Sequence, residues 1–308
     1  MRRIGSILLA TMLLSAALPT SAQQQPSLEE ILDRLTRVSD VYAGNALKFT
    51  VEEVTKVRSD IDRHSPRKMT LVSFYAYYRD ASGALQEKRI RKSAAGRIRR
   101  AETIDDVARI TEAVGDPMAE HGLRGSNLAP FYFERPYSWI FLFSLENRKK
   151  YEYELEDPGE PGRILVRLRP KNEHRTEDAW YATIHVDLET FQIVRAEGMQ
   201  VPDFDQAQRL NEMLASPTDA PADIDDRTFG VLTVSTDFDV RHHGMRFPSR
   251  VEIEFLRHRV AGAAGSKKKK KTDPVARIVQ TYRNYRFYGI ELTTDFLGSG
   301  RPVADDGP

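Results

Sequence analysis

Histidines are the first residues here whose type and spacing suggest chemistry, because imidazole is the commonest metal ligand in proteins. Two sets could share an ion once strands pair: His242, His243 and His258, and His174 with His185. Adjacent residues on a strand point to opposite faces, so His242 and His243 cannot readily bind one ion together. Arginines flank His258 on both sides, and their positive charge disfavours a cation. We therefore expect surface histidines and no metal.

Carboxylates and catalytic motifs give little more. Glu252 and Glu254 share one face of an apparent strand whose other face is apolar, so a solvated face is expected rather than an acid–base pair. There are no cysteines, which excludes thiol catalysis, disulfides and an acylated cysteine. The sequence contains no GxSxG, no HExxH, no phosphate-binding glycine loop and no dinucleotide fingerprint. We expect no catalytic residue and no cofactor.

Aromatic residues offer a binding surface instead. The stretch PFYFERPYSWIFLFSLEN, residues 130–147, has the highest aromatic density in the chain and carries one of its two tryptophans. Such a run either fills a core or lines a ligand cavity. On the second interpretation, the apolar face of the strand that begins at Trp180 would join it. The ligand-binding candidates are then Phe131, Phe133, Trp139, Phe141, Phe143, Trp180 and Ile184.

Two basic stretches are candidates for anion contact. Arg89 begins a run of cations that extends to residue 100, for which a solvated strand face is favoured over an anion site. Five consecutive lysines lie between a small-residue segment and Asp273-Pro274, at the expected tip of a hairpin. They form either a solvated loop or a contact with anionic membrane headgroups. The membrane-contact candidates are Lys267, Lys268, Lys269, Lys270 and Lys271.

The amino terminus and the overall composition set the compartment and exclude some partners. Arg2 and Arg3 precede an apolar run over residues 7–18, and Thr20-Ser21-Ala22 supplies small residues for signal peptidase. We expect a signal peptide cleaved near Ala22 and a periplasmic or secreted protein, with an uncleaved anchor as the alternative. The net charge of +1 over 308 residues gives no indication of nucleic acid binding.

Hydrophobic periodicity predicts the elements that would position these residues. Ser27 and Glu30 form a capping box ahead of an amphipathic helix that reaches Gly44. Further helices are expected over residues 103–114 and 205–214. Strands are expected over residues 47–57, 69–78, 85–92, 150–155, 164–169, 180–187, 191–197, 232–240, 251–255 and 275–288. This order predicts a mainly β (α+β) protein: a curved antiparallel sheet or incomplete β-barrel, with helices packed on its concave face.

The same order resembles the periplasmic lipoprotein-carrier superfamily of LolA/LolB-like and outer membrane lipoprotein-sorting proteins. The residues that carry the resemblance are Leu168-Arg169-Pro170, the hairpin WYATIHVDLETFQIVRAEG (residues 180–198) and Tyr282-Arg283-Asn284-Tyr285-Arg286-Phe287. The resemblance implies one domain over residues 23–297 that binds acyl chains in a lidded incomplete barrel. The helix at 103–114 and the lysine loop at 262–273 would be insertions, and residues 298–308 a disordered tail.

Three functions remain open from the sequence. The first is a non-catalytic periplasmic carrier or sensor that binds lipid, acyl chains or lipoproteins in an apolar cavity. The second is an envelope hydrolase with an unrecognised site, and the third is a scaffold that binds only protein. A roomy apolar interior would favour the carrier. Polar groups such as His185 and Asp187 converging in the interior of the sheet would favour the enzyme. An aromatic segment that packs solidly and leaves no cavity would favour the scaffold.

Overall fold

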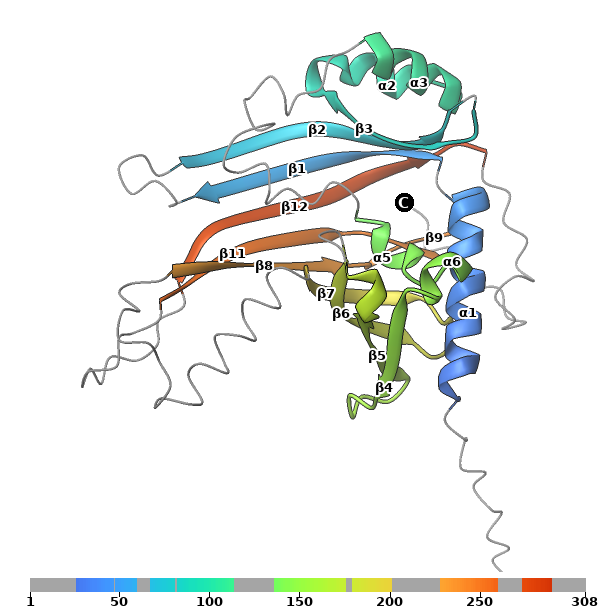
Figure 1. Cartoon of the computed structure of the whole chain (residues 1–308). Coiled ribbons are helices and arrows are strands. Elements are labelled where there is room, and N and C mark those ends of the chain that lie inside the picture. The colour runs from blue at the N-terminus through green and yellow to red at the C-terminus, as the bar shows by residue number, and fades with distance from the viewer. Residues whose placement is uncertain are drawn as a thin grey trace, which may run out of the picture.

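Ten antiparallel strands form one curved sheet in the computed structural model of the chain (Figure 1). The structure describes residues 26–46, 48–59, 67–80, 82–113, 136–175, 179–200, 228–259 and 273–289. The strands of the sheet are β1 (Phe49–Ser59), β2 (Arg67–Arg79), β3 (Leu85–Arg91), β4 (Tyr151–Glu156), β5 (Arg163–Pro170), β6 (Trp180–Asp187), β7 (Ile193–Gln200), β8 (Thr228–Asp237), β11 (Arg250–Arg259) and β12 (Asp273–Phe287). A separate small hairpin consists of β9 (Val240–His242) and β10 (Met245–Phe247).

The strand order is β3-β2-β1-β12-β11-β8-β7-β6-β5-β4, so the sheet has two edges and is not closed. Strand β12, the last of the described strands, lies in the middle of the sheet between β1 and β11. It therefore joins the first three strands to the remaining six. The predicted fold class is confirmed as a curved, open antiparallel sheet.

Helix α1 (Leu28–Val41) lies on the concave side of the sheet, together with the short helices α5 (Ser138–Phe141) and α6 (Leu145–Arg148) (Figure 1). Ser27 caps α1 as predicted, because its hydroxyl accepts a hydrogen bond from the Glu30 amide at 3.2 Å. The apolar stripe of α1 is buried in the core, as at Ile31 and Leu35. None of the described helices is both long and apolar enough to cross a membrane.

A second helical layer covers the opposite face at one edge of the sheet. Helices α2 (Ala95–Arg100) and α3 (Ile104–Ala113) lie over β2 and β3 (Figure 1). Thr103 caps α3, since its hydroxyl accepts from the Asp106 amide at 3.2 Å. The aromatic strand β2 is therefore buried on both faces: Tyr75 packs in the main core and Phe74 in the smaller one under α2 and α3. The sequence prediction had placed helices on the concave face alone.

Several predictions fall outside the described residues. They are the signal peptide over residues 1–22, the candidates Phe131 and Phe133, the helix at 205–214, the lysines 267–271 and the tail at 298–308. The short helices α2, α5 and α6 and the β9–β10 hairpin were not predicted.

Candidate functional site

Four neighbouring strands place polar side chains side by side on the concave face. In register, Glu53 on β1 lies opposite Ser73 on β2, and Thr55 lies opposite Gln280 on β12. The fifth member is Arg89 on β3, whose guanidinium reaches Glu53. These five residues, here called the polar cluster, alternate along their strands with residues of the other face, which is why they converge.

The carboxylate of Glu53 is the centre of the polar cluster and is fully buried. One oxygen, Oε1, accepts hydrogen bonds from Arg89 Nε at 2.9 Å, Thr55 Oγ1 at 3.1 Å and Ser73 Oγ at 3.4 Å. The other, Oε2, accepts from the second guanidinium nitrogen at 3.1 Å and from Gln280 Nε2 at 3.2 Å. A carboxylate offers about four lone-pair sites, so five donors leave it no position from which to abstract a proton. The ion pair of Glu53 and Arg89 therefore stabilises the buried charges and leaves no carboxylate oxygen free to accept a proton.

Two tyrosines lie beside the polar cluster, and their hydroxyl groups are buried without a hydrogen-bond partner among the described residues. Tyr75 is 0% exposed and Tyr282 is 5% exposed. Their ring centroids are 5.9 Å apart, and the Arg89 guanidinium lies 5.0 Å from the centre of the Tyr75 ring. Burial, followed by the negative charge of Glu53, raises the pKa of Tyr282 well above its usual range. The phenol therefore stays protonated and can donate a hydrogen bond.

An aliphatic row crosses the concave face next to the polar cluster. Its members pair in register from β2 through β1, β12 and β11 to β8: Met69, Val57, Ile278, Ile253 and Val234. Four of them are buried in the main core, whereas Met69 is partly exposed. Phe255, one same-face step beyond Ile253, is also partly exposed. The concave face thus sets apolar surface directly beside buried polar groups.

The described part of the aromatic segment packs on the concave face, where Trp139 lies against Gly198, the residue of β7 that pairs with Val234 of the aliphatic row. Trp139 is fully buried, contacts Trp180 at 4.9 Å between ring centroids, and donates from Nε1 to Thr236 Oγ1 at 2.9 Å. A Cβ atom on Gly198 would lie 2.5 Å from the Trp139 ring, so glycine is required there for the ring to reach β7. Of the candidates from the sequence, Trp139, Trp180 and Ile184 belong to one packed core, as does Phe143, and Phe141 is partly exposed at its margin.

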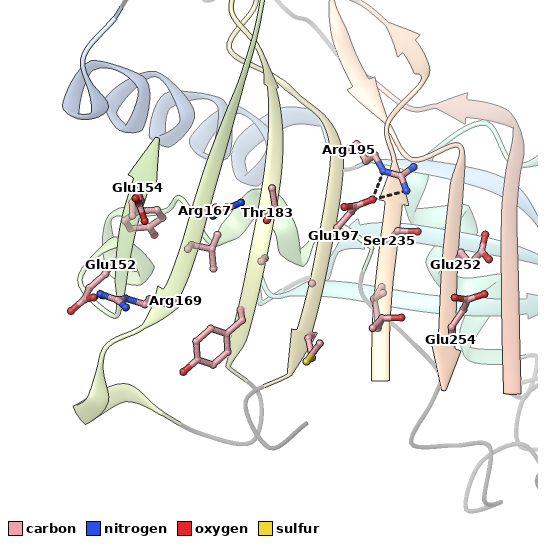
Figure 2. A pocket seen from close by; sticks show the side chains of 18 of the residues that line it. Glu152, Glu154, Arg167, Arg169, Thr183, Arg195, Glu197, Ser235, Glu252 and Glu254 are labelled. Atoms are coloured by element: carbon pink, nitrogen blue, oxygen red, sulfur yellow. Dashed lines mark hydrogen bonds and ion pairs between the residues drawn. The ribbon is translucent and has the colours of Figure 1, made fainter. Parts of the chain in front are cut away.

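The outer face, opposite α1, carries an open groove of about 1150 Å³ (Figure 2). Charged side chains of both signs line it and form ion pairs. Arg169 pairs across strands with Glu152 at 2.7 Å, and Arg195 pairs along β7 with Glu197 at 2.7 Å. Glu252, one of the two carboxylates considered from the sequence, is paired with Arg250. These ion pairs lie on the outer face of the sheet, and the side chains labelled in Figure 2 do not converge on one point.

His185 and Asp187 do not join the polar cluster. His185 lies on the outer face of β6, and burial lowers its pKa. Asp187 caps the β6–β7 turn by accepting from the Glu189 and Thr190 amides, and it also pairs with Arg246 at 3.0 Å. Burial alone would raise the pKa of Asp187, but these hydrogen bonds outweigh it and the pKa is lowered. The aspartate is thus an anchor for the β9–β10 hairpin.

Metal-ligand geometry is not found among the described residues, which contain no group of three or more histidine, aspartate or glutamate side chains that could hold an ion. His242 stacks on Phe287, with ring centroids 3.9 Å apart and an interplanar angle of 8°. The side chain of His258 lies outside the described part of the structure.

Sequence reasoning missed the polar cluster and assigned Arg89 to a solvated face, although its side chain is 7% exposed and ion-paired. The sequence of β1 did contain an indication of a buried carboxylate. Glu53 lies on the same face of the strand as Val51 and Val57, so a charged residue interrupts an otherwise apolar face. Its partners come from three other strands, and only the sheet order reveals them.

Comparison with known proteins gives structural likeness without a sequence match. No family model matches the chain, and no curated protein matches it. Two solved structures align with it. A DUF1329 family protein from Desulfovibrio piger aligns over 87% of this chain and 96% of its own, at 12% identity and a TM-score of 0.34. A LolA superfamily protein from Nitrosomonas europaea aligns over 88% and 97%, at 9% identity and a TM-score of 0.31.

Proposed function

We propose that this protein is a non-catalytic periplasmic carrier or sensor that binds lipid acyl chains or lipoproteins on the concave face of its sheet. The observation that carries the proposal is the aliphatic row, with Met69 and Phe255 still partly exposed, next to a few buried polar groups. Ligand sites are typically concave and mostly apolar, with a small number of placed polar groups. The saturated Glu53 carboxylate argues against the hydrolase.

The aromatic candidates take different parts in this proposal. Phe131, Phe133 and Phe141 remain candidate lining residues. Trp139, Phe143, Trp180 and Ile184 support the wall from within the core, where their exposure is 8% or less.

Retained lipid tests the proposal directly. The full chain, expressed with its native amino terminus and purified from a periplasmic extract without detergent, should begin at Gln23 and should carry acyl lipid detectable by mass spectrometry. The matched control is an unrelated exported protein of similar size, purified in parallel. A chain that retains its first 22 residues would contradict the export step, and lipid no more abundant than in the control would contradict the carrier function.

We also propose that the lysine run 267–271 rests on anionic headgroups and brings the protein to a membrane surface. Each lysine near such a surface contributes on the order of 1 kcal/mol, so five give weak, salt-sensitive binding. Co-sedimentation with anionic vesicles should fall to the level of neutral vesicles when Lys267 to Lys271 are changed to serine, or when salt is raised. Equal binding by the serine variant, or salt-insensitive binding, would leave only a solvated loop.

The protein scaffold is a second candidate, because the described aromatic segment packs solidly. Tyr137, Trp139 and Phe143 are each 1% exposed or less. The lipid measurement separates the two functions, since a scaffold would carry no acyl lipid.

A further inference from the structure

We propose that the hydroxyl groups of Tyr75 and Tyr282 form a subsite that hydrogen-bonds the neutral carbonyl oxygen of an ester- or amide-linked acyl chain. This inference rests on the proposed carrier function and specifies which acyl compounds the site selects. Its starting point is that both phenol oxygens are buried and that the described part of the chain offers neither of them a hydrogen-bond partner. Leaving such a group unsatisfied costs about 1–3 kcal/mol, so a ligand that satisfies both is stabilised by the groups already in place.

The two tyrosine rings belong to one local site. Tyr75 and Tyr282 stand on β2 and β12, on either side of β1, and their rings contact each other nearly edge-on at 67°. Their neighbours on β1 are Val51, opposite Tyr75, and Glu53, opposite Tyr282. Glu53 is already occupied by five donors, so it cannot accept from either phenol without losing one.

Charge selects a neutral acceptor over an anion. Within the polar cluster the guanidinium of Arg89 is bound to Glu53 through two nitrogens, so its positive charge is largely cancelled. The charges of Glu53 and Glu87 raise the pKa of Tyr282 further, and Arg89 opposes them. Because Glu53 and Arg89 neutralise each other, the carboxylate of Glu87 is the charge that disfavours a ligand carboxylate at this point. An ester or amide carbonyl accepts hydrogen bonds without bringing a charge.

The apolar part of the ligand has a surface to follow. The aliphatic row lies two residues beyond the Thr55–Gln280 pair along the strands, on the same face. A carbonyl held at the two phenols would therefore leave its hydrocarbon chain to run along Val57 and Ile278 toward Met69 and Phe255. The two phenol hydroxyl groups would hold the neutral carbonyl of the ligand, and the aliphatic row would contact its hydrocarbon chain.

Three fluorescent probes with the same hydrocarbon chain test the subsite on the full mature protein: a fatty acid methyl ester, the free acid, and a hydrocarbon without a carbonyl. Wild type should bind the ester about tenfold more tightly than the free acid. Tyr75→Phe and Tyr282→Phe should each weaken ester binding about fivefold, which corresponds to one hydrogen bond, and should leave hydrocarbon binding unchanged. Tyr153→Phe is the matched control, because its hydroxyl donates to the Leu142 carbonyl at 2.8 Å, away from this site, and the ester preference should persist.

The outcomes separate the subsite from the carrier function. If wild type binds none of the probes, the carrier function fails. If wild type binds the ester but the two phenylalanine variants bind it equally well, the hydroxyl groups hold only water and the subsite is overturned. Urea unfolding of the ligand-free variants excludes a structural role: removing an unpaired hydroxyl should leave the midpoint unchanged or raise it, whereas a fall in both variants would mean that the hydroxyls serve the fold.

Discussion

Replacing Glu53 with alanine is expected to lower the free energy of unfolding by about 3–5 kcal/mol, because it removes the carboxylate from a buried ion pair and leaves the charge of Arg89 in the core. The side chains of the pair are 0% and 7% exposed, so water cannot replace the lost partner. Three further donors, on Thr55, Ser73 and Gln280, would lose their acceptor at the same time. Urea unfolding of the purified chain measures the change.

Two further variants test whether the loss of stability comes from the buried charge of Arg89. Glu152→Ala removes the partner of Arg169 on the outer face, where the side chains are 51% and 70% exposed; an exposed pair contributes about 0–1 kcal/mol. Replacing Glu53 and Arg89 together with methionine should recover most of the loss, because no buried charge remains. A Glu53→Ala variant as stable as Glu152→Ala would refute the account of the polar cluster.

Trp139→Ala is expected to destabilise the protein by a similar amount, about 3–5 kcal/mol, since it empties a packed site. The indole is fully buried between Trp180 and the backbone at Gly198, and its hydrogen bond to Thr236 would be lost. Gly198→Ala perturbs the same contact from the other side, by adding a methyl group 2.5 Å from the ring, and should cost about 1–3 kcal/mol.

The double variant identifies the cause. Once the indole is gone, the added methyl group has space, so Trp139→Ala with Gly198→Ala should be less destabilised than the sum of the single variants. Additive losses would show that the two residues do not press on each other. A Trp139→Ala variant that keeps wild-type stability but no longer binds a fluorescent acyl probe would assign Trp139 to the ligand cavity instead of the core.

The strands were predictable because their alternation is local. The hairpin of β6 and β7 follows from Trp180 to Val186 alternating with polar residues around a turn at Asp187, and the structure agrees within two or three residues. The cap of α1 was equally local, since Ser27 and Glu30 are three residues apart. Periodicity of this kind is fixed by the geometry of one element, so the sequence alone reveals it.

The candidate site was not predictable for the opposite reason. Glu53 meets Gln280 only because β12 returns to pair with β1, although 227 residues separate the two side chains. It meets Arg89 only because β3 and β1 both pair with β2. A basic residue on a strand usually faces water, and nothing near Arg89 in the sequence marks it as inward. Trp139 shows the same limit, because its environment is made by β6, β7 and β8 together.

The central position of β12 also governs the order in which this molecule can be assembled. Among the described strands, β12 alone joins two groups: β1 to β3 on one side, and β4 to β8 with β11 on the other. Until β12 has been made, the strands of each group can pair only with one another. Contacts so distant in sequence close large loops and slow folding. A nascent chain that stops before β12 would expose two unfinished sheet edges, which are ready templates for aggregation. Because Gln280 and Tyr282 belong to β12, the polar cluster and the proposed hydroxyl pair are complete only after β12 has been made.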